Sequence, residues 1–289
     1  MSTSTIVFNR NNIVSNGYNN QLRFNFSGNA VNFKNQEIAI SAIQIFNSQF
    51  NINGSVYSNN TFSILVPSAS TYQTINISLP NGYYEYSDIS NYITQQLILA
   101  GGYLIDAQDN NVTYSKVSAN ATYYSCQIDL LATPTSLPTG YSRPASGLYS
   151  AGGGGLPTAT NTPKIVLSGN FCNVIGFATG TYPSTTQTTN QSFLSTFTPQ
   201  INPVSSYLVR CNLGNNKATQ PPDILTSFST QGTKIGQLIS VSYPEYQWVT
   251  VNDGWYNNIT LTTVDQDYNY PRFEDTSMLI TLLIRDKKQ

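Results

Sequence analysis

Short runs of alternating hydrophobic and polar residues recur along the whole chain. Between Thr71 and Leu79, the hydrophobic Ile75, Ile77 and Leu79 alternate with polar residues, which is typical of a β-strand with one buried face. Similar patterns predict strands over 22–26, 38–45, 62–66, 103–105, 112–117, 123–131, 164–167, 208–213, 224–228, 235–243, 247–251, 259–264 and 278–284. The alternation changes parity near Ala42, which predicts a bulge or a bend.

One stretch has the period of a helix instead. The hydrophobic residues that would share one helix face are Ile89, Tyr92, Ile93, Leu97 and Ala100. Ser87 is placed to cap the first turn, and Gly101 and Gly102 favour a left-handed end. We therefore expect this helix to pack against the sheets, with Ile93 and Leu97 buried. The hydrophobic residues between 171 and 177 predict one more helical turn inside the core.

Many short, evenly spaced strands favour an all-β fold. We predict a single jelly-roll β-sandwich with one inserted helix and long loop excursions. The expected organisation is an N-terminal arm over residues 1–20 and a jelly-roll domain over 21–289, with a loop-rich excursion around 132–203. Within the arm, Ile6–Phe8 predict a small edge strand and 9–20 has no clear pattern. The arm has two interpretations, a disordered terminus or a segment that reaches a neighbouring molecule.

The excursion is rich in Pro, Gly, Ser and Thr between residues 132 and 163, and a second polar stretch covers 183–203. Such segments bury little hydrophobic surface. We therefore expect residues 132–163 to be exposed and protease-sensitive, and the fold to tolerate shortening of Gly147–Thr160.

Charged residues make up 9% of the 289-residue chain, far below the roughly 25% that is usual. Two interpretations stay open: a genome that favours Asn codons, or a surface used for contacts between subunits. The net charge of −1 and the absence of a basic stripe argue against nucleic-acid binding. No signal peptide opens the chain, no stretch is long enough to span a membrane, and three distant cysteines suit reduced, cytosolic folding.

The sequence contains no histidine. It therefore lacks the commonest general base and the commonest transition-metal ligand. An enzyme would need carboxylates, Lys, Tyr or a cofactor instead. We predict that the chain is not an enzyme, with no catalytic, cofactor-binding or metal-binding residues and no cofactor.

Three local patterns resemble functional sites, but each favours a structural interpretation. The run Gly152–Gly155 lacks the strand and helix of a phosphate-binding loop, so a flexible loop is favoured. Asp265, Asp267 and Asn269 have the spacing of the first calcium-loop ligands, but Tyr270 and Thr276 stand where Gly and Glu belong, which favours a solvated turn. The carboxylates of Glu274 and Asp275 have no predicted partner across a cleft.

Tyrosines are frequent in and near the predicted turns. They are Tyr83, Tyr84, Tyr141, Tyr149, Tyr182, Tyr268 and Tyr270. Exposed tyrosine suits protein interfaces and also stacking on sugars. A carbohydrate- or host-receptor-binding β-sandwich, such as a fibre head or lectin-like module, is therefore the alternative function.

Three segments carry a resemblance to a known family. They are the strand, turn and helix ISLPNGYYEYSDISNYITQQL at 77–97, the stretch NFCNVIGFATGTYP at 170–183, and the last third, with SSYLVRCNLGNN at 205–216, QWVTVNDGWYNNITLTTVDQDYNY at 247–270 and MLITLLI at 278–284. With them the chain resembles the single jelly-roll vertex (penton) proteins, or minor capsid proteins, of virophages, Polinton-like viruses and related large DNA viruses. The segments cover under half of the chain.

The resemblance implies a structural role in a virus particle. Five copies would form a ring at each capsid vertex and contact the major capsid protein, after folding in the host cytoplasm. A host-surface glycan or receptor is a further candidate partner. We also expect that removing Met1–Asn20 leaves the fold intact and weakens attachment to the major capsid protein.

Overall fold

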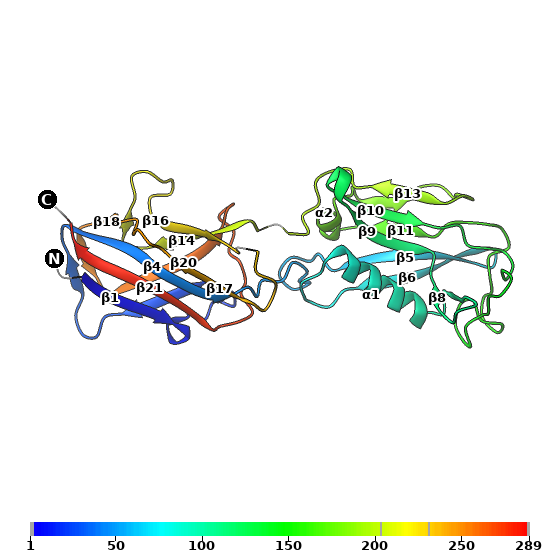
Figure 1. The fold of residues 1–289 in the computed structure, drawn as a ribbon, viewed down its shortest axis with the longest axis horizontal. Helices are drawn as coiled ribbons and strands as arrows, with labels where there is room; N and C mark the ends of the chain where they lie inside the picture. The colour runs from blue at the N-terminus through cyan, green and yellow to red at the C-terminus, as the bar shows by residue number, and fades with distance from the viewer. Residues whose placement is uncertain (1–2, 203, 231, 288–289) are drawn as a thin grey trace. The chain divides into compact units, whose positions relative to one another are not determined.

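Strands form most of the regular structure, which confirms the all-β prediction. A computed structural model describes residues 3–202, 204–230 and 232–287. By their contacts, the residues separate into two compact units. One unit combines Met1–Phe50 with Asn202–Gln289, and the other is Asn51–Ile201. We refer to the second as the inserted unit, because its sequence interrupts the first (Figure 1).

The first unit is built from strands of both chain ends. They are β1 (Thr3–Asn9), β2 (Gln21–Asn25), β3 (Val31–Phe33), β4 (Gln36–Phe46), β14 (Ser206–Cys211), β15 (Gly214–Asn215), β16 (Ile224–Ser229), β17 (Leu238–Ser242), β18 (Val249–Val251), β19 (Gly254–Tyr256), β20 (Asn258–Asp265) and β21 (Met278–Asp286), with a 3-10 turn at Arg10–Asn12. One sheet has the order β1-β21-β4-β18-β15, with β17 also paired to β4, and the other has the order β16-β14-β20-β2.

The strand pairs of this unit are nested. The first strand β1 pairs with the last strand β21, β2 pairs with β20, β4 pairs with β17, and β14 pairs with β16, all antiparallel. A long antiparallel hairpin rolled into two sheets gives this pairing, which is the topology of a jelly roll. We call this the jelly-roll unit. The inserted unit lies in the connection between β4 and β14.

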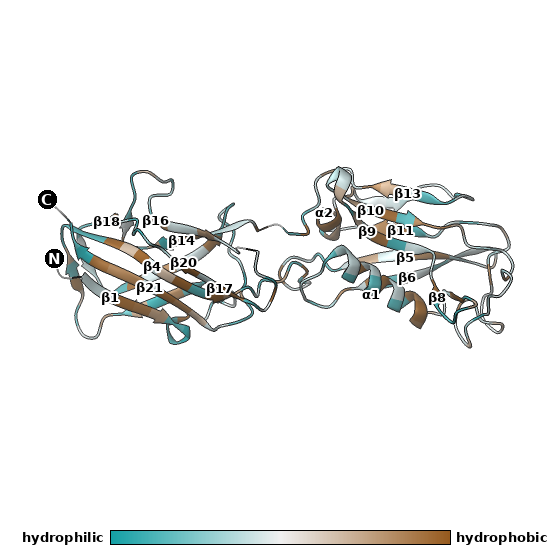
Figure 2. Cartoon of the chain, in the orientation of Figure 1, coloured by the Kyte–Doolittle hydropathy of each residue, from teal (hydrophilic) through white to brown (hydrophobic). Residues whose placement is uncertain are grey.

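The core of the jelly-roll unit follows from the alternation on β4 and β21, whose hydrophobic residues are brown in Figure 2. Ile38, Ile40, Ile43 and Ile45 of β4 are all buried in one cluster although their parity changes. The β4–β21 register skips Ser41, so a bulge at this residue returns both halves of the strand to the same face. The predicted irregularity is therefore confirmed.

The inserted unit has its own core and its own elements. They are β5 (Thr61–Ser68), β6 (Thr71–Ser78), α1 (Tyr86–Leu99), β7 (Leu104–Ile105), β8 (Asn111–Val112), β9 (Ser115–Asn120), a 3-10 turn (Ala121–Tyr123), β10 (Ser125–Leu130), β11 (Lys164–Leu167), α2 (Phe171–Ile175), β12 (Gly180–Tyr182) and β13 (Gln191–Leu194). Its larger sheets have the orders β12-β11-β5-β6 and β13-β10-β9.

Both predicted helical segments are present. In α1, Ile89, Ile93 and Leu97 are buried in the core of the inserted unit, as the spacing predicts. In α2, Phe171 is buried and stacks on Phe62 with ring centroids 4.4 Å apart. The helix ends where Gly176 adopts a positive φ of 76°, a conformation that glycine reaches without strain.

The predicted division into an arm and one domain differs from the observed one. Within the described part of the predicted arm, Thr3–Asn9 form β1, paired with β21 along its whole length, and Phe8 is fully buried. Met1 and Ser2 lie outside the described residues. Residues Thr3–Asn9 of the predicted arm form a strand of the sheet, because Phe8 belongs to the core. Residues 21–289 contribute to two units rather than one.

The predicted exposed loops are also more ordered than their composition suggests. Within 132–163, Tyr149 is fully buried and its hydroxyl donates to the Pro67 carbonyl at 3.0 Å. The backbone amides of Leu148 and Tyr149 donate to the carbonyls of Ala100 and Gly101 at 2.9 and 2.8 Å. Within 183–203, residues Gln191–Leu194 form β13; Pro203 lies outside the described residues. Hydrogen bonds and one large aromatic side chain replace the missing hydrophobic pattern.

Candidate functional site: a polar pocket beside helix α1

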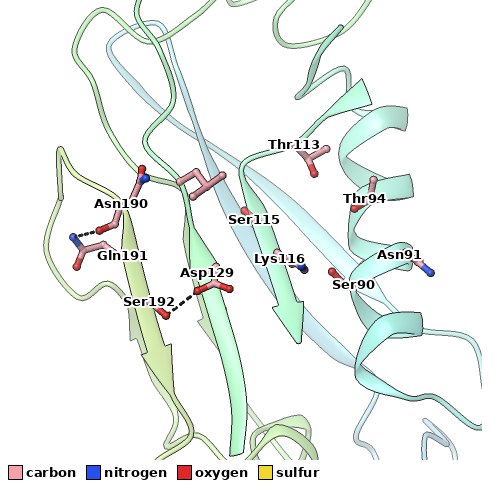
Figure 3. A pocket seen from close by; sticks show the side chains of 11 residues that line it. Ser90, Asn91, Thr94, Thr113, Ser115, Lys116, Asp129, Asn190, Gln191 and Ser192 are labelled. Carbon is pink, nitrogen blue, oxygen red and sulfur yellow. Dashed lines mark hydrogen bonds between the residues drawn. The ribbon is translucent and has the colours of Figure 1, made fainter. Parts of the chain in front are cut away.

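A pocket of about 550 Å³ lies in the inserted unit beside α1 (Figure 3). Almost every side chain around it is polar. The lining residues are Ser90, Asn91 and Thr94 of α1, Thr113, Ser115 and Lys116 on and before β9, Asp129 and Leu131 on and after β10, and Asn190, Gln191 and Ser192 at β13. Its volume falls within the roughly 300–1,000 Å³ of small-molecule sites.

Asp129 is the one acidic residue of this lining, and neighbours fix its orientation. Gln127 Nε2 donates to Asp129 Oδ1 at 2.8 Å, and Ser192 Oγ donates to the same atom at 2.7 Å. The other oxygen, Oδ2, accepts no hydrogen bond from a described residue. The site therefore presents a carboxylate oxygen that is oriented and available.

Lys116 is the basic residue of the pocket. It lies directly opposite Asp129 in the register of β9 and β10, and in Figure 3 it appears between Asp129 and Ser90 of α1. Lys116 forms no ion pair with any residue that the structure describes. The pocket thus carries one positive and one negative group that do not neutralise each other by direct contact.

The edge of β9 adds main-chain groups. Leu131 N donates to Tyr114 O at 2.9 Å, whereas Val117 N donates to Ser90 Oγ at 3.2 Å on the α1 side. Hydrogen-bonding direction alternates along an antiparallel strand, so the Ser115 N–H and C=O also point towards α1. The Ser115 side chain lies on the opposite, buried face, with a hydroxyl that has no partner among the described residues.

The calcium-like spacing at Asp265 forms a turn, as the sequence favoured. Asp265 Oδ1 accepts from the backbone amides of Asp267 and Asn269, each at 2.8 Å, and Oδ2 accepts from Asn269 Nδ2 at 3.0 Å. Asp265 is buried rather than solvated, because these donors replace water. Within the described ranges, no group of three His, Cys, Asp or Glu side chains is placed to hold a metal ion.

The glycine run and the two carboxylates also have structural roles. A Cβ on Gly153 would lie 2.0 Å from the Gly147 carbonyl oxygen, so Gly153 is part of a tightly packed turn rather than a flexible loop. Glu274 forms an ion pair with Arg272 at 3.1 Å. Asp275 Oδ1 accepts from the Ser277 amide at 2.6 Å.

The turn tyrosines divide into exposed and buried ones. Tyr83, Tyr268 and Tyr270 are exposed, whereas Tyr149 is fully buried. None of these tyrosines lines the pocket. No pattern in the sequence indicates the pocket, because the pocket depends on which strands are neighbours and on the face of the sheet that each residue occupies.

Fold and pocket together define a jelly-roll β-sandwich protein that carries a second, β-rich unit with a polar pocket. No protein-family model matches the sequence, and no curated protein matches it. Among solved structures, the chain is similar to the mavirus penton protein, with 12% identity, a TM-score of 0.41, and coverage of 98% of this chain and 96% of that chain. It is also similar to a chain in the structure of the Sputnik virophage, with 11% identity, a TM-score of 0.39, and coverage of 99% and 98%. No helix within the described ranges is both long and apolar enough to cross a membrane.

Proposed function

We propose that the chain is a non-enzymatic capsid protein that forms the pentameric vertex of an icosahedral virus particle and contacts the major capsid protein. The protein would fold in the host cytoplasm and reside in the virion. The observation that carries the proposal is the complete nested jelly roll formed by the two ends of the chain. Jelly rolls are a common architecture of viral capsid domains, although lectins share it.

The composition supports assembly through large contacts. A closed ring needs one side of each subunit to bind a different side of its neighbour. Burying such sides costs little charge desolvation in a chain with only 9% charged residues. The jelly-roll unit also exposes large hydrophobic side chains of the kind found at interfaces: Val7, Tyr18, Val31, Leu238, Tyr246, Trp255, Tyr268 and Tyr270.

The resemblance of the sequence at 77–97, 170–183 and the last third supports the vertex in particular. The first segment contains most of α1, the second contains α2, and the third contains strands of the jelly-roll unit. The resemblance therefore covers parts of both units rather than one.

The mass of the purified protein tests the ring. We expect a species of five copies whose population increases with protein concentration. It should persist at high salt, because its contacts carry few charges. Particle images should place it at the vertices, and the major capsid protein should bind it. A protein that stays monomeric at high concentration and is found only on surface fibres would overturn the proposal.

A further inference from the structure

We propose that the pocket beside α1 binds a saccharide unit that carries a carboxylate, such as a uronic acid. This inference does not depend on the capsid role. It rests on the mixture of groups in the pocket. Asn91, Thr94 and Thr113 make no side-chain hydrogen bond to a described residue, and Asp129 Oδ2 and the Ser115 backbone are equally available. A polyhydroxylated ligand suits such a set, because each hydroxyl both donates and accepts.

The charges decide which saccharide fits. Lys116 would ordinarily pair with Asp129 across the strands. Gln127 and Ser192 instead hold one Asp129 oxygen, and Lys116 has no carboxylate partner among the described residues. A ligand carboxylate would supply that partner in a charge-assisted hydrogen bond.

The same charges fix the orientation of the ligand. A carboxylate beside Asp129 would be repelled, so the acidic group must lie on the α1 side of Lys116. The ring hydroxyls then face Asp129 Oδ2, which accepts from them. The main-chain groups of Ser115 and the amide of Asn91 lie on the α1 side and bind the remaining oxygens.

A nuclear magnetic resonance titration of the full-length protein tests this assignment, with glucuronate, glucose and acetate as probes. Glucuronate should cause saturable shifts confined to residues around Ser115, Lys116 and Asp129. Glucose should bind at the same place more weakly, because it lacks the charged group. High salt should weaken only the binding of glucuronate. Acetate should cause no saturable shift.

Two variants and one control sharpen the test. Lys116→Gln should weaken glucuronate binding by roughly tenfold or more, as expected when one charge-assisted hydrogen bond is lost, and leave glucose binding unchanged. Asn91→Ala should weaken both ligands. Lys217→Gln, at an exposed lysine of the jelly-roll unit, makes the same charge change and should alter neither.

Three results would overturn the proposal. Shifts scattered over the surface would show that the pocket is not a site. Unchanged glucuronate binding in Lys116→Gln would show that the carboxylate of the ligand does not bind Lys116. Acetate shifts equal to those of glucuronate would show that Lys116 pairs with any carboxylate and that the pocket recognises no sugar. The amide spectrum of each variant checks that it is folded.

Discussion

The side-chain amide of Asn51 donates a hydrogen bond of 2.8 Å to the main-chain carbonyl of Ile201. These are the first and the last residues of the inserted unit. Asn51 Nδ2 also donates to the Tyr84 carbonyl at 2.8 Å, and Asn51 Oδ1 accepts from the Tyr84 amide at 2.8 Å. One buried side chain thus ties together both ends of the insertion and the turn before α1.

Replacing Asn51 with Ala should destabilise the inserted unit by roughly 1–3 kcal/mol, because it leaves partly buried main-chain groups of Tyr84 and Ile201 without their partner. Both tryptophans, Trp248 and Trp255, belong to the jelly-roll unit, so their fluorescence does not report the insertion. Hydrogen exchange of α1 and β5 during urea unfolding measures the change. Asn111→Ala, at an exposed residue, serves as the control and should change stability by less than about 0.5 kcal/mol. Equal effects of the two substitutions would contradict this role of Asn51.

The buried face of α1 gives a second prediction. Leu97 is 2% exposed, whereas Leu99, two residues later, is 78% exposed. Leu97→Ala should cost roughly 2–5 kcal/mol through lost burial and a cavity. Leu99→Ala should have almost no effect on the unfolding midpoint. If both variants melt like the parent protein, α1 does not contribute to the core.

The N-terminal strand gives a third prediction, which reverses the expectation from the sequence. Removing Met1–Asn20 deletes β1, whose partner β21 would then lie at an open edge. We expect loss of the folded jelly-roll unit. The finer test is Phe8→Ala, which should cost roughly 3–5 kcal/mol, against Val7→Ala on the exposed face of the same strand. Tryptophan fluorescence during urea unfolding reports this unit, and a stable truncated protein would restore the interpretation as an arm.

The packed loop gives a fourth prediction. Shortening Gly147–Thr160 removes Tyr149 from the core, so we expect the inserted unit to lose its cooperative unfolding. Tyr149→Phe removes only the hydroxyl that binds the Pro67 carbonyl and should cost roughly 0.5–1.5 kcal/mol. Tyr123→Phe, at an exposed tyrosine, is the matched control. A shortened protein with unchanged hydrogen exchange would show that the loop is dispensable.

Local periodicity was sufficient to predict individual elements. The burial of Ile93 and Leu97 follows from helical spacing, and the bulge at Ser41 follows from a parity change within one strand. Such features depend only on neighbours in sequence. The nested pairing of β1 with β21 joins residues at opposite ends of the chain, and alternation does not specify which strand is the partner.

Neither the insertion nor the pocket can be predicted from the sequence, for related reasons. No distinct linker marks the change of unit at Phe50 and Asn51, because the stretch NSQFNINGSVYSNN at 47–60 is rich in Asn and Ser, like loops elsewhere in the chain. The loop around Tyr149 looks disordered by composition, yet a few hydrogen bonds to Ala100 and Gly101 fix it. Lys116 and Asp129 are neighbours only because the β9–β10 register places them opposite each other.

The last prediction concerns pH. Burial raises the pKa of the Cys126 and Cys211 thiols from 9.0 to about 12. The pKa of Tyr114 rises from 10.0 to about 12, mainly because of burial and secondly because of its coulombic interaction with Tyr141. In the unfolded chain these groups lose their protons at their ordinary pKa values. Their contribution to stability is therefore fully present below about pH 9 and lost as the pH rises towards 12.

Urea unfolding at a series of pH values between about 8 and 11 should show this decline. Because the thiolate is the reactive form, iodoacetamide at about pH 8 should leave Cys126 and Cys211 unmodified in the native protein and label them quickly in urea. The rate at each cysteine, followed by mass spectrometry, then reports the opening of one unit: Cys126 belongs to the inserted unit and Cys211 to the jelly-roll unit. Asn51→Ala should speed labelling at Cys126 more than at Cys211, and Phe8→Ala should do the opposite. Rapid labelling of both thiols in the native protein would contradict their burial.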